Sequence, residues 1–545
     1  MIREEIKNQI LSAIKNTFGE REPPGFSIEI PENPEHGDYA TNAAMILAKA
    51  LKKKPIEIAS ALAEELRIKN KELRTETVPP GFINFWLSRG ALNREFAEIL
   101  KKDKKYGRGE KKKEKIQVEF ISANPTGPPT LANGRGGFLG DVLANVLEFS
   151  GYGVEREYYV NDTGNQILTF GKSFLAAAGL IPEEENFYKG AYVKKWAKAH
   201  RVLVKKCKND PMRLGREAAR VFLKDIKAVI KKAGIGFDRF TSEYNHLHKK
   251  KFVKKALDHL RRTGAVYKKD GAVWLKTTSF GDDKDRVLVT SDDFATYFLS
   301  DAGHYLETKS RGFDAKINIL GPDHYGYVKR IQAAAKLLGL KKSEVVVTQA
   351  VRIVRGGKEM KMSKRRGDFL AFEELIKEVG SDAARYFFLE KSPDTHMDFD
   401  LDLAKERSVK NPVYYIQYAH ARIASIFRKA SSLRHPEGAK RPKDLKRSFA
   451  SLRMTLLKEK EELDLIKKLI QFPEVVEDTA RDYQVHRLTR YAYELARVFH
   501  NFYEKHRVIT EDKELTQARL ALVKAAQIVL QQVLGLLGIS APERM

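Results

Sequence analysis

The spacing of apolar positions changes twice along the chain and predicts three regions of different architecture. Apolar residues recur at helical intervals from Ile2 to Phe18 and from Tyr39 to Leu51, and a second pair of helices is expected after Pro55. The segment from Pro79 to Leu87 is typical of a strand. We therefore expect residues 1–105 to form a small α+β domain.

Beyond residue 105 the pattern alternates between strands and helices. Helical spacing runs from Gly137 to Phe149 and resumes near Asn165. Apolar runs with the composition of buried strands occupy residues 116–121, 154–160, 316–320 and 344–350. This alternation predicts an α/β fold, in which residues 106–380 form a doubly wound parallel sheet of the Rossmann type.

Two long segments are predicted to be helical throughout. Residues from about 180 to 285 are strongly basic and carry no recognisable motif, so we interpret them as a helical insertion in the sheet domain. Residues 381–545 have helical spacing almost everywhere, with a polar, proline-containing interruption from Arg434 to Lys446. We expect these residues to form an all-α bundle.

The charge balance points to a polyanionic partner. The chain has 99 Lys and Arg against 72 Asp and Glu, a formal net charge of +27. Such an excess favours binding to nucleic acid through phosphate contacts, although charge kept for solubility is an alternative. The segment Lys101 to Lys115 is the densest in positive charge and is interpreted as a linker or a phosphate-facing strap.

Cysteine content and hydropathy exclude several classes of protein. The single cysteine, Cys207, excludes an intrachain disulfide and a cysteine-rich zinc site, so we expect no zinc. No uninterrupted apolar run approaches the ~18 residues that span a bilayer. The first helix contains Glu4 and Glu5, unlike a signal or transit peptide. We expect a cytoplasmic protein that does not enter a membrane, and a monomer.

The segment KMSKRRGDF, Lys361 to Phe369, is the most informative motif. Lys361 and Lys364 flank Met362 and Ser363 in a basic segment between an apolar run and a helix-like stretch. Ammonium groups on flexible stems can follow the negative charge that develops on a leaving pyrophosphate. An ordinary solvated basic turn is the alternative.

A turn rich in glycine and proline, Ser122 to Gly137, follows the first predicted strand of the sheet. Ligands of an open α/β sheet bind beyond the carboxyl ends of the strands. Glycines allow a ligand to approach the backbone, and a helix that begins near Gly136 would direct its free amides at phosphate. The turn is therefore a candidate nucleotide site, with a tight structural turn as the alternative.

These motifs resemble those of the arginyl-tRNA synthetase family. KMSKR resembles the KMSKS signature of class I aminoacyl-tRNA synthetases, and ANPTGP followed by GRG resembles the arginyl branch. The resemblance extends over almost the whole chain and includes EYYVNDTGNQI, SDDFATYFLSDAGHY, ILGPDHYGYVKR, GSDAARYFFL and, most specifically, NPVYYIQYAHARI. At the four HIGH positions stand Thr130 to Asn133, so both histidines of that signature are missing.

The resemblance implies ATP-dependent ligation of L-arginine to tRNA(Arg) through an arginyl-adenylate, with release of AMP and pyrophosphate. Magnesium would act as counter-ion, and tRNA is expected to bind before arginine is activated. The implied catalytic residues are Thr130, Asn133, Lys361 and Lys364. Further ATP contacts are implied for Pro125, Gly127, Ala132, Gly134, Gly136, Met362 and Ser363.

Arginine selection has its own physical requirement. A guanidinium presents five donors in a planar fork, so a selective site needs carboxylates set for bidentate contact. The resemblance nominates Glu119 and Asp301 as these acids and Tyr297 as an aromatic wall. It also implies that the α-amino and carboxylate ends of the substrate contact Ser122 and Asn124, with His324 nearby. Ordinary surface acids remain the alternative for both carboxylates.

Candidate tRNA contacts lie near both ends of the chain. Phe82, Asn84 and Trp86 alternate along a strand and share one face, which suits stacking on an unpaired base, although the aromatics could equally be core. The resemblance assigns residues 1–105 to the tRNA elbow and residues 381–545 to the anticodon. In the second region we select Tyr414 and Tyr418, with a core role as the alternative.

Two other functions are compatible with parts of the pattern. A non-catalytic tRNA-binding protein descended from a synthetase would explain the missing histidines, but the retained loop lysines and candidate arginine acids argue against it. A class I synthetase for another amino acid, such as cysteine, is disfavoured by the lack of cysteine zinc ligands and by the motif at Asn411 to Ile423.

Overall fold

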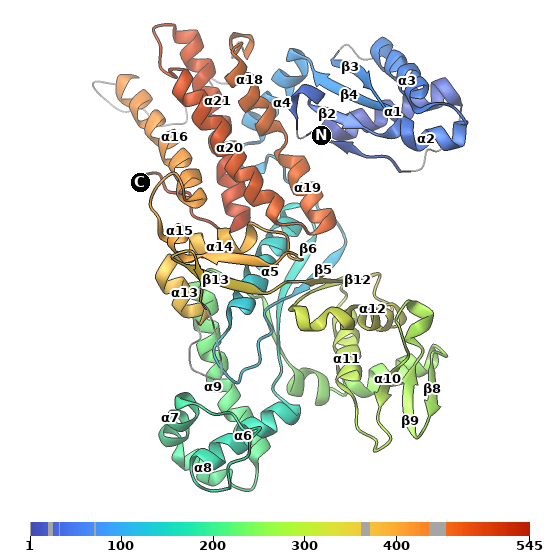
Figure 1. Cartoon of the computed structure of the whole chain (residues 1–545), viewed down its shortest axis with the longest axis vertical. Coiled ribbons are helices and arrows are strands. Elements are labelled where there is room, and N and C mark those ends of the chain that lie inside the picture. Colours follow the sequence, from blue (N-terminus) through green and yellow to red (C-terminus); the bar gives the residue numbers. More distant parts are fainter. Residues whose placement is uncertain (1, 20–24, 32, 70–71, 361–370, 435–453) are drawn as a thin grey trace.

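The computed structural model describes residues 2–19, 25–31, 33–69, 72–360, 371–434 and 454–545. At the N-terminus, helices α1 (Ile2–Phe18), α2 (Ala43–Leu51) and α3 (Pro55–Lys69) pack with an antiparallel sheet in the order β1-β2-β4-β3 (Figure 1). Its strands are β1 (Ile28–Glu29), β2 (Tyr39–Thr41), β3 (Leu73–Val78) and β4 (Phe82–Leu87). The α+β prediction is confirmed, but Pro55 begins one helix instead of a pair, because residues 73–78 pair with β4 as a strand.

A five-stranded parallel sheet in the order β12-β11-β5-β6-β7 lies at the centre of the molecule. The strands are β5 (Lys115–Glu119), β6 (Gly153–Val160), β7 (Arg239–Ser242), β11 (Ala315–Leu320) and β12 (Lys342–Val347). The chain order reverses between β5 and β11, so the sheet is doubly wound with its switch point at these two strands. The predicted Rossmann-type fold is confirmed. The register places Asn318 of β11 beside Glu119 of β5.

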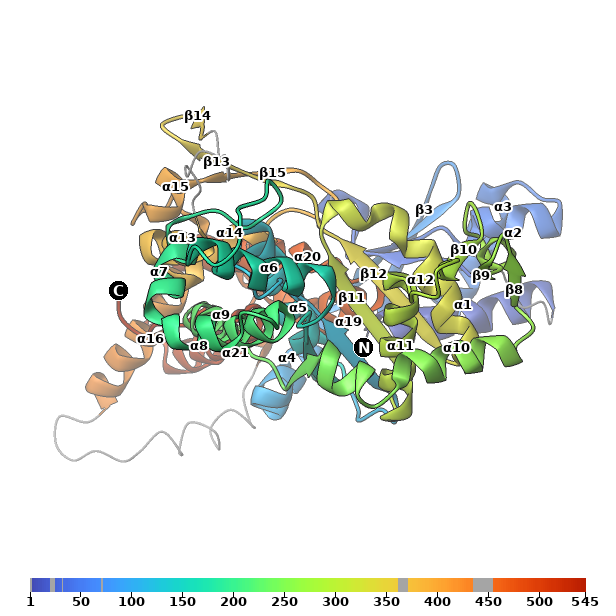
Figure 2. The same ribbon diagram turned by 90° about the horizontal axis from the view of Figure 1, so that it is seen from below.

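Helices cover both faces of this sheet, as Figure 2 shows from below. On one face lie α5 (Leu131–Phe149) and α9 (Pro211–Lys232), and on the other lie α11 (Tyr297–Ser310) and α12 (Val328–Leu337). Right-handed crossovers between parallel strands produce this two-sided arrangement. Helix α5 is buried along nearly its whole length, which explains its high content of glycine and apolar residues.

The region from about 180 to 285 is not the all-helical insertion that the sequence predicted. Helices α6 (Gly164–Ala177), α7 (Ala191–Ala199), α8 (Arg201–Lys206) and α9 precede β7, which completes the main sheet. After α10 (Phe252–Arg262), strands β8 (Val266–Lys269), β9 (Ala272–Leu275) and β10 (Arg286–Val289) form a separate antiparallel sheet. These strands have four residues each, too few for alternation to stand out among basic side chains.

A small sheet joins the parallel sheet to the C-terminal helices. Its strands are β13 (Val351–Arg355), β14 (Lys358–Glu359) and β15 (Met397–Asp400). Between them lie α13 (Phe372–Val379) and α14 (Ser381–Leu389), and α15 (Leu401–Lys405) follows. Strand β15 is an exception to the predicted helical region, because it pairs in parallel with β13.

The C-terminal region is a helical bundle, as expected. It contains α16 (Pro412–Arg434), α18 (Lys460–Ile470), α19 (Phe472–Asp482), α20 (His486–Lys505) and α21 (Lys513–Leu537), and α4 (Arg89–Lys102) packs against it. Helix α21 is long and apolar enough to cross a membrane, but 72% of its most apolar window is buried inside the structure, as in the central helix of a bundle. The predicted interruption after Arg434 lies outside the described residues.

Candidate active site

A cavity of about 1120 Å³ opens at the switch point of the sheet, beyond the ends of β5 and β11. Most of the residues predicted to bind arginine and ATP line it: Glu119, Ser122, Asn124, Gly127, Thr130, Ala132, Asn133, Tyr297, Asp301 and His324. The sequence did not single out other lining residues, including Tyr159, Gln166, Tyr188, Lys189, Tyr192, His304, Tyr305, Asn318, Asp323 and Tyr327. Residues separated by about 200 positions in the chain therefore form one wall.

Glu119, the last residue of β5, is 7% exposed, and both of its oxygens already accept hydrogen bonds. Oε1 accepts from the Ser122 hydroxyl at 3.1 Å, while Oε2 accepts from Asn318 Nδ2 at 2.7 Å. Lys316 Nζ lies 2.9 Å from Oε2. A carboxylate oxygen accepts about two hydrogen bonds, so Oε1 alone keeps room for a ligand. Glu119 therefore offers a ligand one oxygen, and a second carboxylate, such as the predicted Asp301, has to supply the other contact with a guanidinium.

Ser122 supports Glu119 instead of standing free for the substrate. Its hydroxyl donates to Glu119 and accepts a hydrogen bond from the backbone N–H of Tyr159 at 3.1 Å. The backbone of Ser122 has a φ of 38°, a conformation that non-glycine residues rarely adopt. The predicted contact of Ser122 with the ends of the amino acid is thus replaced by a role in orienting the acid. Asn124 remains exposed on the cavity wall.

Asp301 lies on α11 and faces the same cavity. The hydroxyl of Tyr327 donates a short hydrogen bond to its Oδ2. Burial raises the pKa of Asp301 to about 7; the hydrogen bond from Tyr327 opposes the rise, and the charge of Glu119 adds to it. Two acids with different hydrogen-bond partners therefore line one cavity, close enough for the charge of one to affect the other.

The two remaining arginine candidates lie toward the surface. Tyr297 is the first residue of α11 and is 68% exposed, one helical turn before Asp301. Thr296 caps this turn by accepting a hydrogen bond from the N–H of Leu299. His324 is exposed in the short helix after β11, with its ring edge toward Tyr327. Both line the cavity, and their contact with the amino acid stays a prediction.

Thr130 and Asn133 form the N-terminal cap of α5. The Thr130 hydroxyl accepts from the N–H of Asn133 at 3.3 Å, and Oδ1 of Asn133 accepts from the N–H of Thr130 at 2.9 Å. The Thr130 hydroxyl also donates to the same Oδ1 at 2.9 Å. Among the described residues no partner is found for the Nδ2 amide of Asn133, which lines the cavity. Asn133 therefore has an amide donor that no described residue accepts, whereas the Thr130 hydroxyl already donates to Asn133.

Helix α5 begins at Leu131, not near Gly136 as predicted, because the Thr130 cap starts it one and a half turns earlier. The N–H of Gly134 donates to the carbonyl of Thr130, so it is not free for phosphate. A Cβ on Gly134 would lie 2.4 Å from the ring of Phe372. The lack of a side chain at Gly134 therefore lets α13 pack closely against α5 and does not make room for a ligand. Gly136 is likewise buried. The ATP contacts predicted for these two glycines are therefore wrong.

Two other turn residues have different positions. Pro125 is buried in the turn and does not line the cavity, whereas a Cβ on Gly127 would meet nothing within 4 Å. The amides of Leu131 and Ala132, in the first turn of α5, have no intrahelical acceptor. Ala132 is exposed to the cavity, which agrees with its predicted place beside a nucleotide.

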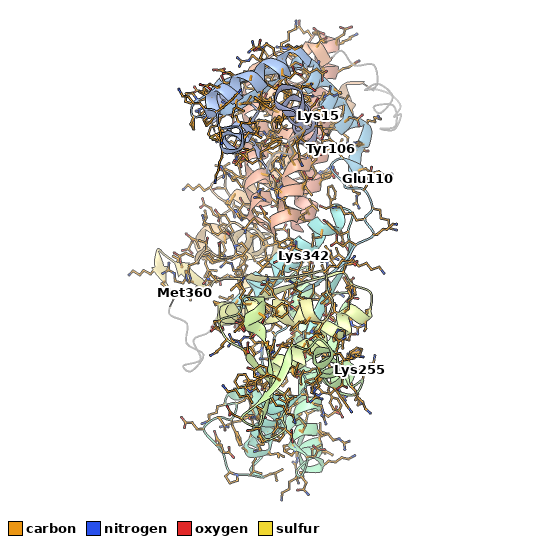
Figure 3. All side chains as sticks on the ribbon, turned by 90° about the vertical axis from the view of Figure 1, so that its right-hand side faces the viewer. Lys15, Tyr106, Glu110, Lys255, Lys342 and Met360 are labelled. Atoms are coloured by element: carbon orange, nitrogen blue, oxygen red, sulfur yellow. The ribbon has the colours of Figure 1, made fainter. Side chains whose placement is uncertain are left out.

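Lys361, Met362, Ser363 and Lys364 lie outside the described residues. The residues on either side are described: Met360 follows β14 at the side of the molecule (Figure 3), and Ala371 precedes α13. The N–H of Phe372 donates to the carbonyl of Pro129 at 3.2 Å. The chain that leaves the loop is therefore held against the turn that leads into α5.

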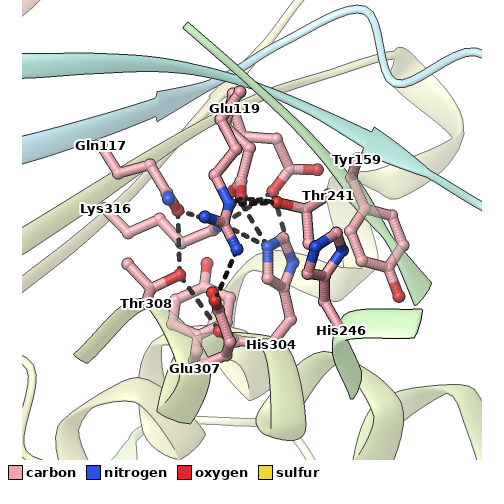
Figure 4. A network of polar contacts seen from close by, with 12 residues as sticks. Gln117, Glu119, Tyr159, Thr241, His246, His304, Glu307, Thr308 and Lys316 are labelled. Atoms are coloured by element: carbon pink, nitrogen blue, oxygen red, sulfur yellow. Dashed lines mark hydrogen bonds and ion pairs between the residues drawn. The ribbon is translucent and has the colours of Figure 1, made fainter. Parts of the chain in front are cut away.

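A buried polar network behind the cavity was missed from the sequence (Figure 4). It joins Gln117 and Glu119 of β5, Glu157 of β6, His304 of α11 and Lys316 of β11. The signal that could have found it is polar residues two apart in strands expected to be buried on both faces. Gln117 and Glu119 follow this pattern, as do Lys316 and Asn318.

The tRNA candidates differ in exposure. Phe82 is 37% exposed, but Asn84 is 4% exposed, so the expected exposed amide is wrong. Asn84 lies in a strand that pairs on both sides, with Ala40 and with Glu76. Trp86 is half-buried, and the guanidinium of Arg74 stacks on its ring at 3.9 Å.

In the bundle, Tyr414 and Tyr418 are half-buried on α16 with parallel rings 6.3 Å apart. Arg422 lies over the ring of Tyr418 at 4.9 Å. These side chains form a partly exposed aromatic and basic surface. Their partial exposure is compatible both with a core role and with contact to an unpaired base.

Known proteins match the chain along almost its whole length. Three family models match successive parts of the chain: "Arginyl tRNA synthetase N terminal domain" at residues 4–87, "tRNA synthetases class I (R), catalytic domain" at 95–425, and "DALR anticodon binding domain" at 416–545. Arginine–tRNA ligases of Desulforamulus reducens and Listeria monocytogenes are 42% and 43% identical, over 99% of this chain and at least 98% of theirs. The arginyl-tRNA synthetase structure of Thermus thermophilus superposes with a TM-score of 0.76 at 22% identity, with both chains fully covered.

Proposed function

The chain belongs to the arginyl-tRNA synthetase family, and from that premise we propose how its cavity selects and activates arginine. It is an arginine–tRNA ligase: it uses ATP to aminoacylate tRNA(Arg) with arginine, and the family does so through an adenylate. The observation that carries our proposal is that Glu119 and Asp301 line the same cavity as the first turn of α5.

The guanidinium of arginine bridges the two acids. Glu119 accepts one N–H through Oε1, and Asp301 accepts another through its carboxylate, of which only Oδ2 accepts a hydrogen bond from Tyr327. A planar fork of donors can reach two separated carboxylates, whereas a single ammonium cannot hold the same spacing. Tyr297 covers the entrance, and Asn124 contacts the polar end of the amino acid.

ATP lies over the first turn of α5. The free amides of Leu131 and Ala132, the Nδ2 amide of Asn133 and the positive end of the helix face its phosphates. The arginine carboxylate attacks the α-phosphorus, the bond to the β-phosphate oxygen breaks, and pyrophosphate leaves. Lys361 and Lys364 neutralise the charge that develops on pyrophosphate, and the protein supplies no covalent nucleophile. Magnesium would act as a counter-ion that neutralises part of the phosphate charge of ATP.

The terminal ribose hydroxyl of tRNA(Arg) then attacks the carbonyl carbon of the adenylate, and AMP leaves. We propose that residues 1–105 contact the tRNA elbow through Phe82 and Trp86. Residues 381–545 contact the anticodon, with Tyr414 and Tyr418 on the partly exposed surface of α16. We take the active form to be a cytoplasmic monomer. Size-exclusion chromatography of the purified protein tests the monomeric state.

ATP–pyrophosphate exchange tests the proposal, with arginine or lysine as substrate and with or without tRNA. We expect exchange with arginine and tRNA and none with lysine, because one ammonium cannot bridge both acids. Glu119→Gln should raise the arginine KM roughly tenfold to a hundredfold, the range for losing a hydrogen bond to a charged group. The matched control, Glu110→Gln, changes an exposed acid outside the cavity and should leave KM unchanged. Equal exchange with lysine, or an unaltered KM in Glu119→Gln, contradicts the proposal.

A further inference from the structure

Lys316 is a fully buried cation for which the reaction above has no use. It lies in the middle of the sheet on β11 and is 0% exposed. Figure 4 shows its side chain among Gln117, Glu119 and His304; Glu119 and His304 line the cavity, whereas Lys316 does not. Isolated ammonium groups are strongly disfavoured in a protein interior, so a lysine in this position needs compensating partners.

The three N–H donors of Lys316 have three oxygen acceptors. Nζ lies 2.7 Å from Gln117 Oε1, 2.9 Å from Glu119 Oε2 and 3.1 Å from Glu157 Oε2. The Nε2 atom of His304 lies 2.9 Å from the same Glu157 oxygen, which makes His304 a donor to that acid. Glu119, Glu157 and His304 together resemble the ligand set of a metal ion, but the ammonium fills the space between them.

Charged groups from every neighbouring element face this cluster. Glu157 pairs with Arg239 of β7 at 3.8 Å and with Arg311, which follows α11, at 3.4 Å. Glu307 pairs with both of these arginines, and Glu155 pairs with Arg311. Glu119 faces Asp301, His304 and the rings of Tyr159 and Tyr305. Four glutamates thus meet three cations, Lys316, Arg239 and Arg311. Asp301 adds a further acid close to Glu119, and the buried acid Glu243 acts on both Asp301 and Tyr159.

Removal of Lys316 would leave Glu157 and Glu119 with different hydrogen-bond and ion-pair partners. Glu157 would keep Arg239, Arg311, His304 and the hydroxyl of Thr241. Glu119 would keep only neutral donors and the more distant Nδ1 of His304, at 3.8 Å. Burial lowers the pKa of Lys316, but Glu119 and Glu157 outweigh it and raise that pKa above its ordinary value. The ammonium is therefore charged, and Glu119 depends on it most.

We propose that Lys316 is a positioning residue for arginine selection: its buried ammonium keeps Glu119 and Glu157 charged together and holds Oε2 of Glu119, so that Oε1 faces the substrate. The inference rests on the proposed contact between Glu119 and the guanidinium. Without the ammonium, two buried carboxylates within reach of one another cannot both stay ionised, and the less supported one takes up a proton. Protonated Glu119 would then bind a guanidinium poorly.

The test is the pH dependence of the arginine KM in tRNA aminoacylation by the full chain. Lys316→Met should raise KM about thirtyfold at pH 7 and shift the midpoint of its pH profile upward by about one unit, as Glu119 ionises late. In the double variant Lys316→Met/Glu157→Gln the competing charge is removed. Its midpoint should return to that of the unmodified protein, while KM stays about threefold to tenfold raised because Oε2 lacks its donor. Lys115→Met, an exposed lysine on the same sheet, is the matched control and should change neither value.

Each outcome decides the inference. An unshifted midpoint in Lys316→Met, or equal midpoints in the single and double variants, overturns it, since a merely structural role would not move with pH. If the single variant does not fold, the charge-balanced double variant decides alone: a KM equal to that of the unmodified protein overturns the proposal. A failure of the proposed arginine site itself gives a different result: Glu119→Gln would leave the arginine KM unchanged.

Discussion

At the scale of single residues, the two arginine-binding candidates differ in their environments more than in their chemistry. Glu119 is held by Ser122, Asn318 and Lys316, whereas Asp301 has one hydrogen bond from Tyr327 and a pKa that burial raises to about 7. Both residues were predicted from the sequence, because the motifs that contain them are local. The partners were not, since Lys316 and Asn318 reach Glu119 only through strand pairing about 200 residues apart.

The raised pKa of Asp301 predicts a pH-dependent affinity for arginine. Below pH 7 the carboxyl is protonated and cannot pair with a guanidinium, so affinity is lost as pH falls through that value and recovered as it rises. We expect the arginine KM to fall from pH 6 to pH 8, approaching tenfold per unit on the acid side. Steady-state aminoacylation across this range measures it.

Two variants separate this effect from general titration. Asp301→Asn should raise KM and abolish the pH dependence, because the titrating group is gone. Asp323→Asn, which changes an exposed acid of the same cavity, should preserve it. A KM that is equal at pH 6 and pH 8 in the unmodified protein refutes the assignment.

At the scale of elements, helix α5 shows how one segment combines packing with ligand binding. Its cap is Thr130 with Asn133, and its glycines let neighbouring elements approach its backbone. The sequence predicted a ligand role for those glycines, because glycine-rich turns often bind phosphate. It could not reveal that Gly134 faces Phe372, which lies 238 positions later in the chain. The first turn of α5 keeps the ligand role, and the next turn serves packing.

Two glycines of α5 should respond in opposite directions to alanine. In Gly134→Ala the new methyl lies 2.4 Å from the buried ring of Phe372, so the melting temperature should fall, by the equivalent of about 1–3 kcal/mol. In Gly136→Ala the nearest atom is 3.6 Å away, and the gain in helix propensity should stabilise the protein by up to about 1 kcal/mol. Calorimetry of both variants measures the contrast; equal shifts would show that Phe372 moves aside freely.

At the scale of the whole molecule, the two ends of the chain are joined. The N-terminal domain docks on α19 of the bundle, where Arg3 contacts Asp478 at 2.6 Å and the hydroxyl of Tyr39 donates to Glu474 at 3.1 Å. Lys467 of α18 also pairs with Asp38 at 2.8 Å. Burial raises the pKa of Glu474 to about 7, while Arg3 opposes this rise. The relative position of two proposed tRNA-binding regions therefore depends on a few buried charges.

Arg3 and Arg481 both bind the carboxylate of Asp478, but only Arg3 joins the N-terminal domain to the bundle, so it should contribute more to stability. Arg3→Met removes the partly buried cation that pairs with Glu474 and Asp478 and should cost about 3 kcal/mol of stability, with a raised KM for tRNA and an unaltered KM for arginine. Arg481 also contacts Asp478 at 2.6 Å but is 65% exposed, so Arg481→Met should cost less than about 1 kcal/mol. Calorimetry and aminoacylation kinetics test both. Equal losses in the two variants would refute the docking role.

The sequence by itself determined the family, the Rossmann-type core, the two flanking regions and the two acids proposed to bind arginine. Motifs and periodicity are local, and strands β5, β6, β11 and β12 each show them within a few residues. Only the tertiary structure decided that β7 joins the main sheet, that the cap of α5 uses Thr130 and Asn133, and that Lys316 compensates Glu119 and Glu157. These outcomes depend on which distant segments become neighbours, and the short-range pattern of residues does not specify such long-range contacts.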